Sequence, residues 1–256
     1  MPNFPPVTIG VITYKRPDEI RTTLNALVAH LSYDGPLRIM ISDDSSGGTY
    51  LKDLIDWWTH KGHGTLTGWH FETISTKENA GWGRNANHLL NLGFEDCPYL
   101  FMMEDDYVLK RPLDLSAGVT LMQHEPTLGM LRYRATAGMP VLYYQRETNI
   151  SDQYPNYQEY FGYTRGRVTW LELLSNSPSL WLYSNGPHLK NRDFHGVYGR
   201  YPVGEKLGIT EEKFAHIVKD TMMSHPATPK IGVLPEWIYM HWDHIGKSYQ
   251  HTEFDK

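Results

Sequence analysis

The chain begins with a strand-length run that is apolar on both faces. Val7–Tyr14 read VTIGVITY, a near-continuous series of β-branched residues. A half-exposed strand would alternate apolar with polar residues, so this run is typical of a strand buried on both sides. Up to about residue 110, further short apolar runs alternate with amphipathic stretches. That order predicts an α/β fold in which helices cover a mostly parallel sheet.

The first half carries signals for four strands and the helices between them. Pro17, Asp18 and Glu19 favour a helix start, because proline fits the first turn and acids complement the helix dipole. Apolar spacing and turn residues predict further strands at Leu37–Ser42, Trp69–Ser75 and Tyr99–Met103, a helix from about Tyr50 to Lys61, and a glycine-bearing loop at Asn79–Asn85 before a helix.

The second half is less regular. Arg132–Arg167 is rich in arginine and tyrosine and contains no lysine. We predict a long hairpin or lid there, since linkers are rarely this aromatic. We also expect a helix opened by Thr210 as its N-cap, and strands at Leu180–Tyr183, Ile231–Leu234 and Trp237–Met240.

Composition excludes several classes of protein. A single cysteine, Cys97, can form neither an intramolecular disulfide nor a cysteine-based zinc finger, and it fits a reducing compartment. The formal net charge of −5 argues against wholesale binding to nucleic acid or anionic membranes. No stretch reaches the roughly 18 apolar residues that a spanning helix needs. We therefore expect a cytoplasmic protein without a membrane span.

Three adjacent carboxylates, Glu104, Asp105 and Asp106, follow the fourth predicted strand. Ligands of open α/β sheets bind beyond the carboxyl ends of the strands, and three carboxylates there repel one another unless a cation joins them. Oxygen ligands suit Mg²⁺ or Mn²⁺, which complete their coordination with substrate phosphates. The alternative is an acidic turn in contact with solvent.

Polar loops also follow the second and third predicted strands. Asp43 or Asp44 could accept hydrogen bonds from a ribose hydroxyl or a base N–H, and helix capping is the alternative for one of the two. Gly81 allows close backbone approach, and Arg84 offers a planar set of donors for phosphate oxygens. An ordinary turn before a helix is the alternative for this loop.

In this order and spacing, the motifs resemble those of the GT-A nucleotide-sugar glycosyltransferases, particularly the inverting family 2. The resemblance rests on TIGVITYKRP at 8–17, ISDDSS at 41–46, NAGWGRNA at 79–86 and MEDD at 103–106, the last as the counterpart of the DXD motif. It implies a GT-A, Rossmann-like mixed sheet flanked by helices. It also implies one domain, in which residues 1–110 bind the nucleotide sugar and residues 111–256 form an irregular acceptor-side, catalytic half.

The resemblance implies roles for individual residues. The donor would contact Thr13, Tyr14, Arg16, Asp43, Asp44, Gly81, Arg84 and Asp105. Likenesses in the C-terminal tail add Lys247 and Ser248 to the donor site, and His244 to Asp106 and Glu104 as ligands of Mn²⁺ or Mg²⁺. Glu104 stands where the family has aspartate. The family's catalytic base is matched by Glu211, with Glu212 and Glu205 as alternatives.

These residues predict a metal-dependent glycosyltransferase that moves a sugar from a nucleoside diphosphate, by analogy UDP, to an acceptor hydroxyl with inversion. Glu211 would remove the acceptor's proton. A sugar-phosphate nucleotidyltransferase and a non-catalytic carbohydrate-binding module are the two alternatives. A glycan, a lipid-linked hydroxyl and a modified nucleobase are all compatible acceptors, and any oligomeric state is compatible with the sequence.

Overall fold

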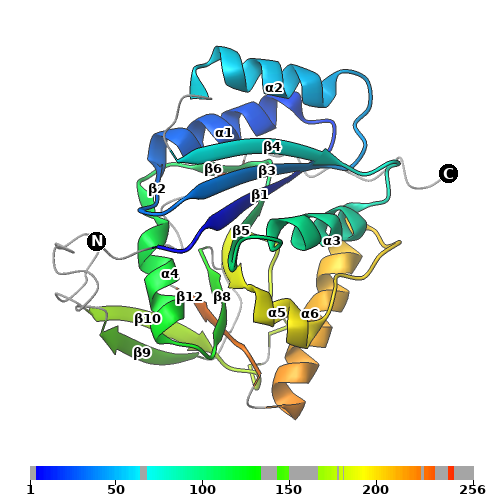
Figure 1. The fold of residues 1–256 in the computed structure, drawn as a ribbon. Helices are drawn as coiled ribbons and strands as arrows, with labels where there is room; N and C mark the ends of the chain where they lie inside the picture. Colours follow the sequence, from blue (N-terminus) through cyan, green and yellow to red (C-terminus); the bar gives the residue numbers. More distant parts are fainter. Residues whose placement is uncertain are drawn as a thin grey trace.

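The computed structural model is built around one mixed sheet of nine strands (Figure 1). It describes residues 4–63, 68–133, 143–149, 167–177, 179–180, 182–225, 228–233 and 242–244. In spatial order the strands are β4 (Trp69–Ser75), β3 (Leu37–Asp43), β1 (Val7–Thr13), β5 (Tyr99–Glu104), β11 (His188–Asn191), β8 (Leu128–Arg132), β12 (Lys230–Val233), β10 (Arg167–Leu173) and β9 (Tyr143–Asn149).

Two short strand pairs and the helices complete the described fold. β2 (Leu31–Ser32) pairs with β7 (Leu113–Asp114), and β6 (Tyr107–Leu109) pairs with β13 (Trp242–His244). The helices are α1 (Pro17–His30), α2 (Tyr50–His60), α3 (Trp82–Gly93), α4 (Leu115–His124), α5 (Arg192–Tyr198) and α6 (Leu207–Ser224). Among the described residues, no helix is both long enough and apolar enough to cross a bilayer.

Alternation along the strands sends side chains into two cores. Val7, Ile9 and Val11 of β1 pack in a core with residues of α1, α2 and α4. Ile12 of the same strand packs in a second core with residues of α3, α5 and α6. Figure 1 shows α1 and α2 on one side of β1, β3 and β4 and α3 on the other. The run at 7–13 is therefore buried throughout, because both faces of β1 are covered.

The parallel strands bring the polar loops to one edge. β1 is parallel to both β3 and β5, with Thr13 opposite Asp43 and Ile12 opposite Glu104. Parallel strands in register end together, so the loops after β1, β3 and β5 meet beyond their carboxyl ends. The predicted α/β fold with a mixed sheet is confirmed. β9 lies in the segment predicted to be a hairpin or lid, and its antiparallel partner β10 begins at the last residue of that segment.

Three local predictions were wrong. The strand predicted at Leu180–Tyr183 is absent from the described residues there: Leu182 and Tyr183 lie outside any strand. Their side chains are buried in the core, which accounts for their apolar character without strand pairing. The strand that follows in this region is β11. Thr210 lies inside α6 instead of capping it, because its side chain is buried against the start of α3. α3 already begins at Trp82, inside the predicted loop. The strand predicted at Trp237–Met240 lies outside the described residues.

A substitution of Gly83, in the first turn of α3, tests how closely this helix packs on the loop before α6. A Cβ atom at Gly83 would lie 2.0 Å from the carbonyl oxygen of Pro202, so Gly83→Ala should lower the free energy of unfolding by about 1–3 kcal/mol. Gly196 in α5 has open space around it, and Gly196→Ala should raise the same quantity by about 0.5–1 kcal/mol. Urea unfolding of both variants measures the difference; a Gly83 variant as stable as the wild type would contradict this packing.

Candidate active site

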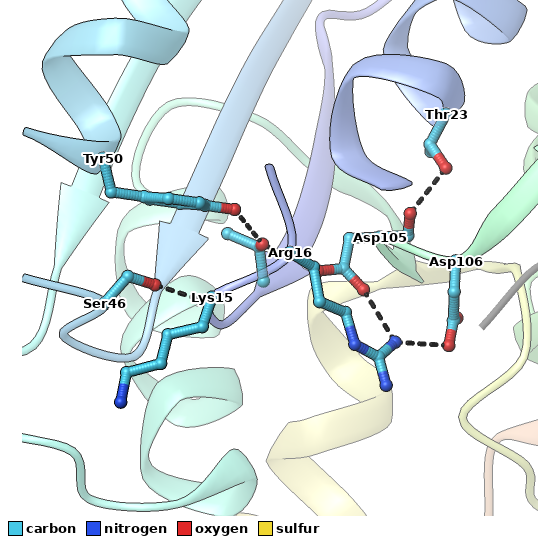
Figure 2. A network of polar contacts seen from close by, with 8 residues as sticks. Lys15, Arg16, Thr23, Ser46, Tyr50, Asp105 and Asp106 are labelled. Carbon is cyan, nitrogen blue, oxygen red and sulfur yellow. Dashed lines mark hydrogen bonds and ion pairs between the residues drawn. The ribbon is translucent and has the colours of Figure 1, made fainter. Parts of the chain in front are cut away.

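A hydrogen-bonded network joins the ends of β1 and β5 (Figure 2). The Thr13 hydroxyl donates to Oδ2 of Asp105 over 2.7 Å, so the Tyr50 hydroxyl, 2.6 Å away, must donate to Thr13. Thr23 of α1 donates to the backbone oxygen of Asp105 over 2.6 Å. Burial raises the pKa of Asp105 to about 7, although Thr13 and the charge of Arg16 lower it. Asp105 is therefore held from β1, α1 and α2 together.

Arg16 is the cation that joins the carboxylates of this network. Its Nη1 lies 2.6 Å from Oδ2 of Asp106 and 3.2 Å from Oδ1 of Asp105, as Figure 2 shows. The arginine side chain is only 15% exposed, and the two carboxylates are 4% and 6% exposed. Sequence reasoning required a positive partner for these acids, and within the chain that partner is Arg16.

Glu104 points to the other face of the sheet. Leu100 and Met102 of β5 lie in the core formed with α3, α5 and α6, and strand alternation places Glu104 on the same side. Burial, followed by the negative charges of Asp106 and Glu211, raises the pKa of Glu104 well above its ordinary value. Its Oε1 atom is buried and has no hydrogen-bond partner in the part of the chain that the structure describes. Glu104 and Asp105 thus face opposite sides of the sheet, and the charge of Asp106 acts on both Arg16 and Glu104.

Of the three candidates for the base, Glu211 is the one whose negative charge helps to raise the pKa of Glu104. It is half-buried on α6, and its Oε1 accepts a hydrogen bond of 2.8 Å from the backbone N–H of Asn185. Glu212 is exposed on the same helix. Glu205 lies before α6 and forms an ion pair with Lys213.

Asp43 and Asp44 are both buried, and their carboxylates accept hydrogen bonds from other residues of the chain. Asp43 accepts from the backbone N–H and the hydroxyl of Ser46, and from the Ser75 hydroxyl. Asp44 accepts from the Thr76 hydroxyl and from the N–H groups of Ala80 and Gly81, over 3.0, 3.0 and 2.9 Å. Both carboxylates therefore organise loops at this edge, and their contact with a nucleoside stays a prediction.

The other predicted donor residues lie around the same edge. Gly81 caps α3 with a φ of +80°, a conformation that favours glycine. Arg84 is exposed, with its Nη1 3.4 Å from Oε1 of Glu78. Tyr14 is half-buried, and Nζ of Lys15 lies 5.0 Å from the centre of its ring. Their contacts with a donor remain predictions.

Strand β13, near the C-terminus, pairs with β6, the strand that directly follows the three carboxylates. Its backbone pairs with β6 so that His244 lies opposite Tyr107, the residue directly after Asp106. This register brings the backbone of a predicted metal ligand beside the predicted metal site. Lys247 and Ser248 lie outside the described residues.

The acidic edge suits a hard divalent cation, although no cluster of three or more His, Cys, Asp or Glu side chains within the described ranges is arranged to hold one. Mg²⁺ commonly binds through one or two carboxylates and completes its coordination with water and substrate phosphate. Asp106 and Glu104 supply such oxygens, and the partnerless buried Oε1 of Glu104 is an available acceptor. These donors fit Mg²⁺ or Mn²⁺.

Several residues of the site were not among the sequence-based candidates, and two of them contact a proposed functional side chain from far along the chain. Tyr50 opens α2 and contacts Thr13, and Asn185 precedes β11 and contacts Glu211. Neither belongs to a motif, and both contacts join distant parts of the chain. A local pattern carries no signal for either.

The sequence model of the family described as "Glycosyl transferase family 2" matches residues 8–190, well over half of the chain. The chain belongs to this glycosyltransferase family. No curated protein matches it. The family match spans the network around Arg16 and the three carboxylates, and ends at Lys190 in β11.

Solved structures show the same GT-A fold. S. aureus TarS in complex with UDP-GlcNAc has a TM-score of 0.57 at 15% identity, over 95% of this chain and 61% of that one. The mannosyltransferase PcManGT from Pyrobaculum calidifontis, in complex with GDP-Man and Mn²⁺, has a TM-score of 0.57 at 14% identity, over 96% of this chain and 58% of that one. GalNAc-T7 with UDP, GalNAc and Mn²⁺ has a TM-score of 0.57 at 11% identity, over 91% and 43%. The chain thus spans well under two thirds of each of these proteins' length.

Removing Arg16 should destabilise the fold, because it leaves two buried carboxylates without their cation. In metal-free buffer, Arg16→Met should lower the free energy of unfolding by about 3 kcal/mol, the lower end for a broken buried ion pair. Lys52→Met, which removes an exposed pair with Asp56, should leave it unchanged. Urea unfolding compares them, and equal stability of the two variants would show that Arg16 does not compensate these acids.

Proposed function

We propose that the chain is an inverting, metal-dependent transferase that moves a sugar from a nucleoside diphosphate, UDP by preference, to an acceptor hydroxyl. The observation that carries the proposal is the division of the acidic turn after β5. Asp105 meets Arg16 on one side of the sheet, Glu104 lies on the other side where the charge of Glu211 acts on it, and the charge of Asp106 acts on both Arg16 and Glu104. The turn after β5 can thus contact a donor diphosphate on one side and lie beside an acceptor on the other.

The donor would lie over the carboxyl ends of β1 and β3, with residues 1–110 forming its site. Thr13 and Asp43 lie opposite each other in register there, and Arg16 follows in the turn between β1 and α1. UDP is supported by the UDP and UDP-GlcNAc in the structures of TarS and by the UDP of GalNAc-T7. The GDP-Man of PcManGT supports the broader class of nucleotide sugars.

Asp106 and Glu104 would hold the metal, with His244 near them through the pairing of β13 and β6. When bound, Mn²⁺ or Mg²⁺ offsets negative charge on the departing diphosphate. Mn²⁺ in the structures of PcManGT and GalNAc-T7 supports this cofactor. Arg16 forms an ion pair with Asp106 and would share this carboxylate with the metal.

Glu211 would act as general base on the acceptor side, formed by residues 111–256. The acceptor oxygen bonds to the anomeric carbon of the sugar while the bond from that carbon to the diphosphate breaks, and Glu211 takes the acceptor's proton. The hydrogen bond from Asn185 leaves the second carboxylate oxygen of Glu211 for this transfer. A positioned base contributes roughly 10²- to 10⁴-fold to such a step.

Donor binding tests the metal directly. In calorimetric titrations with UDP, the wild type should bind more tightly with Mn²⁺ than with a chelator, and Asp106→Asn should lose most of that gain while staying folded. Asp18→Asn, which changes an exposed carboxylate of α1, serves as the matched control. Equal UDP affinity of the wild type in Mn²⁺ and in chelator would rule out this role for the metal.

The base is tested by Glu211→Gln beside Glu212→Gln. In a screen of UDP-sugars against hydroxyl acceptors, the Glu211 variant should transfer at least about 10²-fold more slowly and bind UDP normally, because its side chain faces the acceptor. The Glu212 variant, changed at an exposed position of the same helix, should transfer normally. The reverse result would move the base to Glu212, and release of sugar 1-phosphate instead of UDP would indicate transfer of the nucleotidyl group.

A further inference from the structure

Lys190 is a buried lysine in the middle of the sheet. It lies on β11, between β5 and β8, and is fully buried. Its Nζ lies 2.9 Å from Nε2 of His195 and 2.7 Å from the Tyr201 hydroxyl. Burial lowers the pKa of Lys190 well below its ordinary value, and no carboxylate forms an ion pair with it among the described residues. An apolar side chain would fill the same space without this desolvation cost.

The hydrogen bonds that leave Lys190 have a defined direction. Nδ1 of His195 must donate to the carbonyl oxygen of Gly199, 2.7 Å away, so Nε2 of the neutral ring accepts from Lys190. The Tyr183 hydroxyl lies 2.8 Å from Oδ1 of Asn185 and 2.7 Å from the Tyr201 hydroxyl. Tyr183 is the donor in both contacts and has one proton to share between the two oxygens.

The chain of hydrogen bonds ends at Glu211. It runs from Lys190 through the hydroxyls of Tyr201 and Tyr183 to the side chain of Asn185, whose own backbone N–H donates to Oε1 of Glu211. Asn185, Tyr183 and Tyr201 are all at least 96% buried. Hydrogen bonds between buried groups are stronger than in water and limit the arrangements open to these side chains, although Nδ2 of Asn185 has no partner among the described residues.

We propose that Tyr183 and Tyr201, anchored on Lys190, are positioning residues that orient Asn185 and through it the Glu211 carboxylate. The inference rests on the proposed role of Glu211 as the base. The two tyrosines contact no reacting atom. They limit the motion of the loop that contains Asn185, whose backbone N–H donates a hydrogen bond to Glu211. A base displaced by about 1 Å can lose on the order of 10²-fold in rate, so such a support has a measurable effect.

The structural part is tested on the free protein by NMR of the Asn185 backbone amide. Glu211→Gln should move its resonance upfield, because a charged acceptor is lost, and Tyr183→Phe should move it the same way and speed its hydrogen exchange at least tenfold. Tyr201→Phe should repeat the effect. Tyr198→Phe is the control, since that buried hydroxyl donates instead to Pro229. An Asn185 amide unchanged by both Tyr183→Phe and Tyr201→Phe would overturn the inference.

The functional part is tested by a double-mutant cycle on sugar transfer. Tyr183→Phe should lower kcat about tenfold with an unchanged KM for the donor, and should cause no further loss in the Glu211→Gln background. An equal loss in both backgrounds would overturn the inference. If Glu211→Gln abolishes transfer but Tyr183→Phe is fully active, the positioning role alone fails. If Glu211→Gln is fully active, the proposed base fails as well.

Discussion

The ion pair of Arg16 with Asp105 and Asp106 is the interaction on which the site depends. Two adjacent carboxylates are almost fully buried at the end of β5, and their charges are costly there without a partner. Arg16 supplies that partner from the turn between β1 and α1. The same contact ties the first parallel strand to the acidic turn and thereby sets the shape of the edge where we propose that the donor diphosphate binds.

Strand alternation determines what each acid of the turn can do. Consecutive residues leave β5 on opposite faces, so Asp105 meets Thr13 and Arg16 while Glu104 approaches Glu211. Behind Glu211, the polar network from Lys190 crosses the core formed with α3, α5 and α6. In our proposal the two faces of one sheet thus separate the donor side of the reaction from the acceptor side, and the turn after β5 joins them.

The sequence predicted the features that depend on local pattern. The strand at Trp69–Ser75 has the predicted bounds, and α1 and α2 begin where their turn residues indicate, because periodicity and end signals act within a few residues. It failed where contacts between distant segments decide the outcome. Thr210 looks like an N-cap but is buried inside α6, and the partners of Arg16, Glu104 and Asn185 are distant in the chain. The acids were identified as a group, but their division between two faces needed the register of β5.

A crystal structure of the chain with UDP and Mn²⁺ tests the central claim most directly, that the edge beyond β1, β3 and β5 is the donor site. The account predicts the uracil ring beside Thr13 and Asp43, the diphosphate beside Arg16, and Mn²⁺ bound by Asp106. Arg16 would then have exchanged part of its contact with Asp106 for a phosphate oxygen. UDP bound at any other place in the fold, or at this edge with Mn²⁺ remote from Asp106, would contradict it.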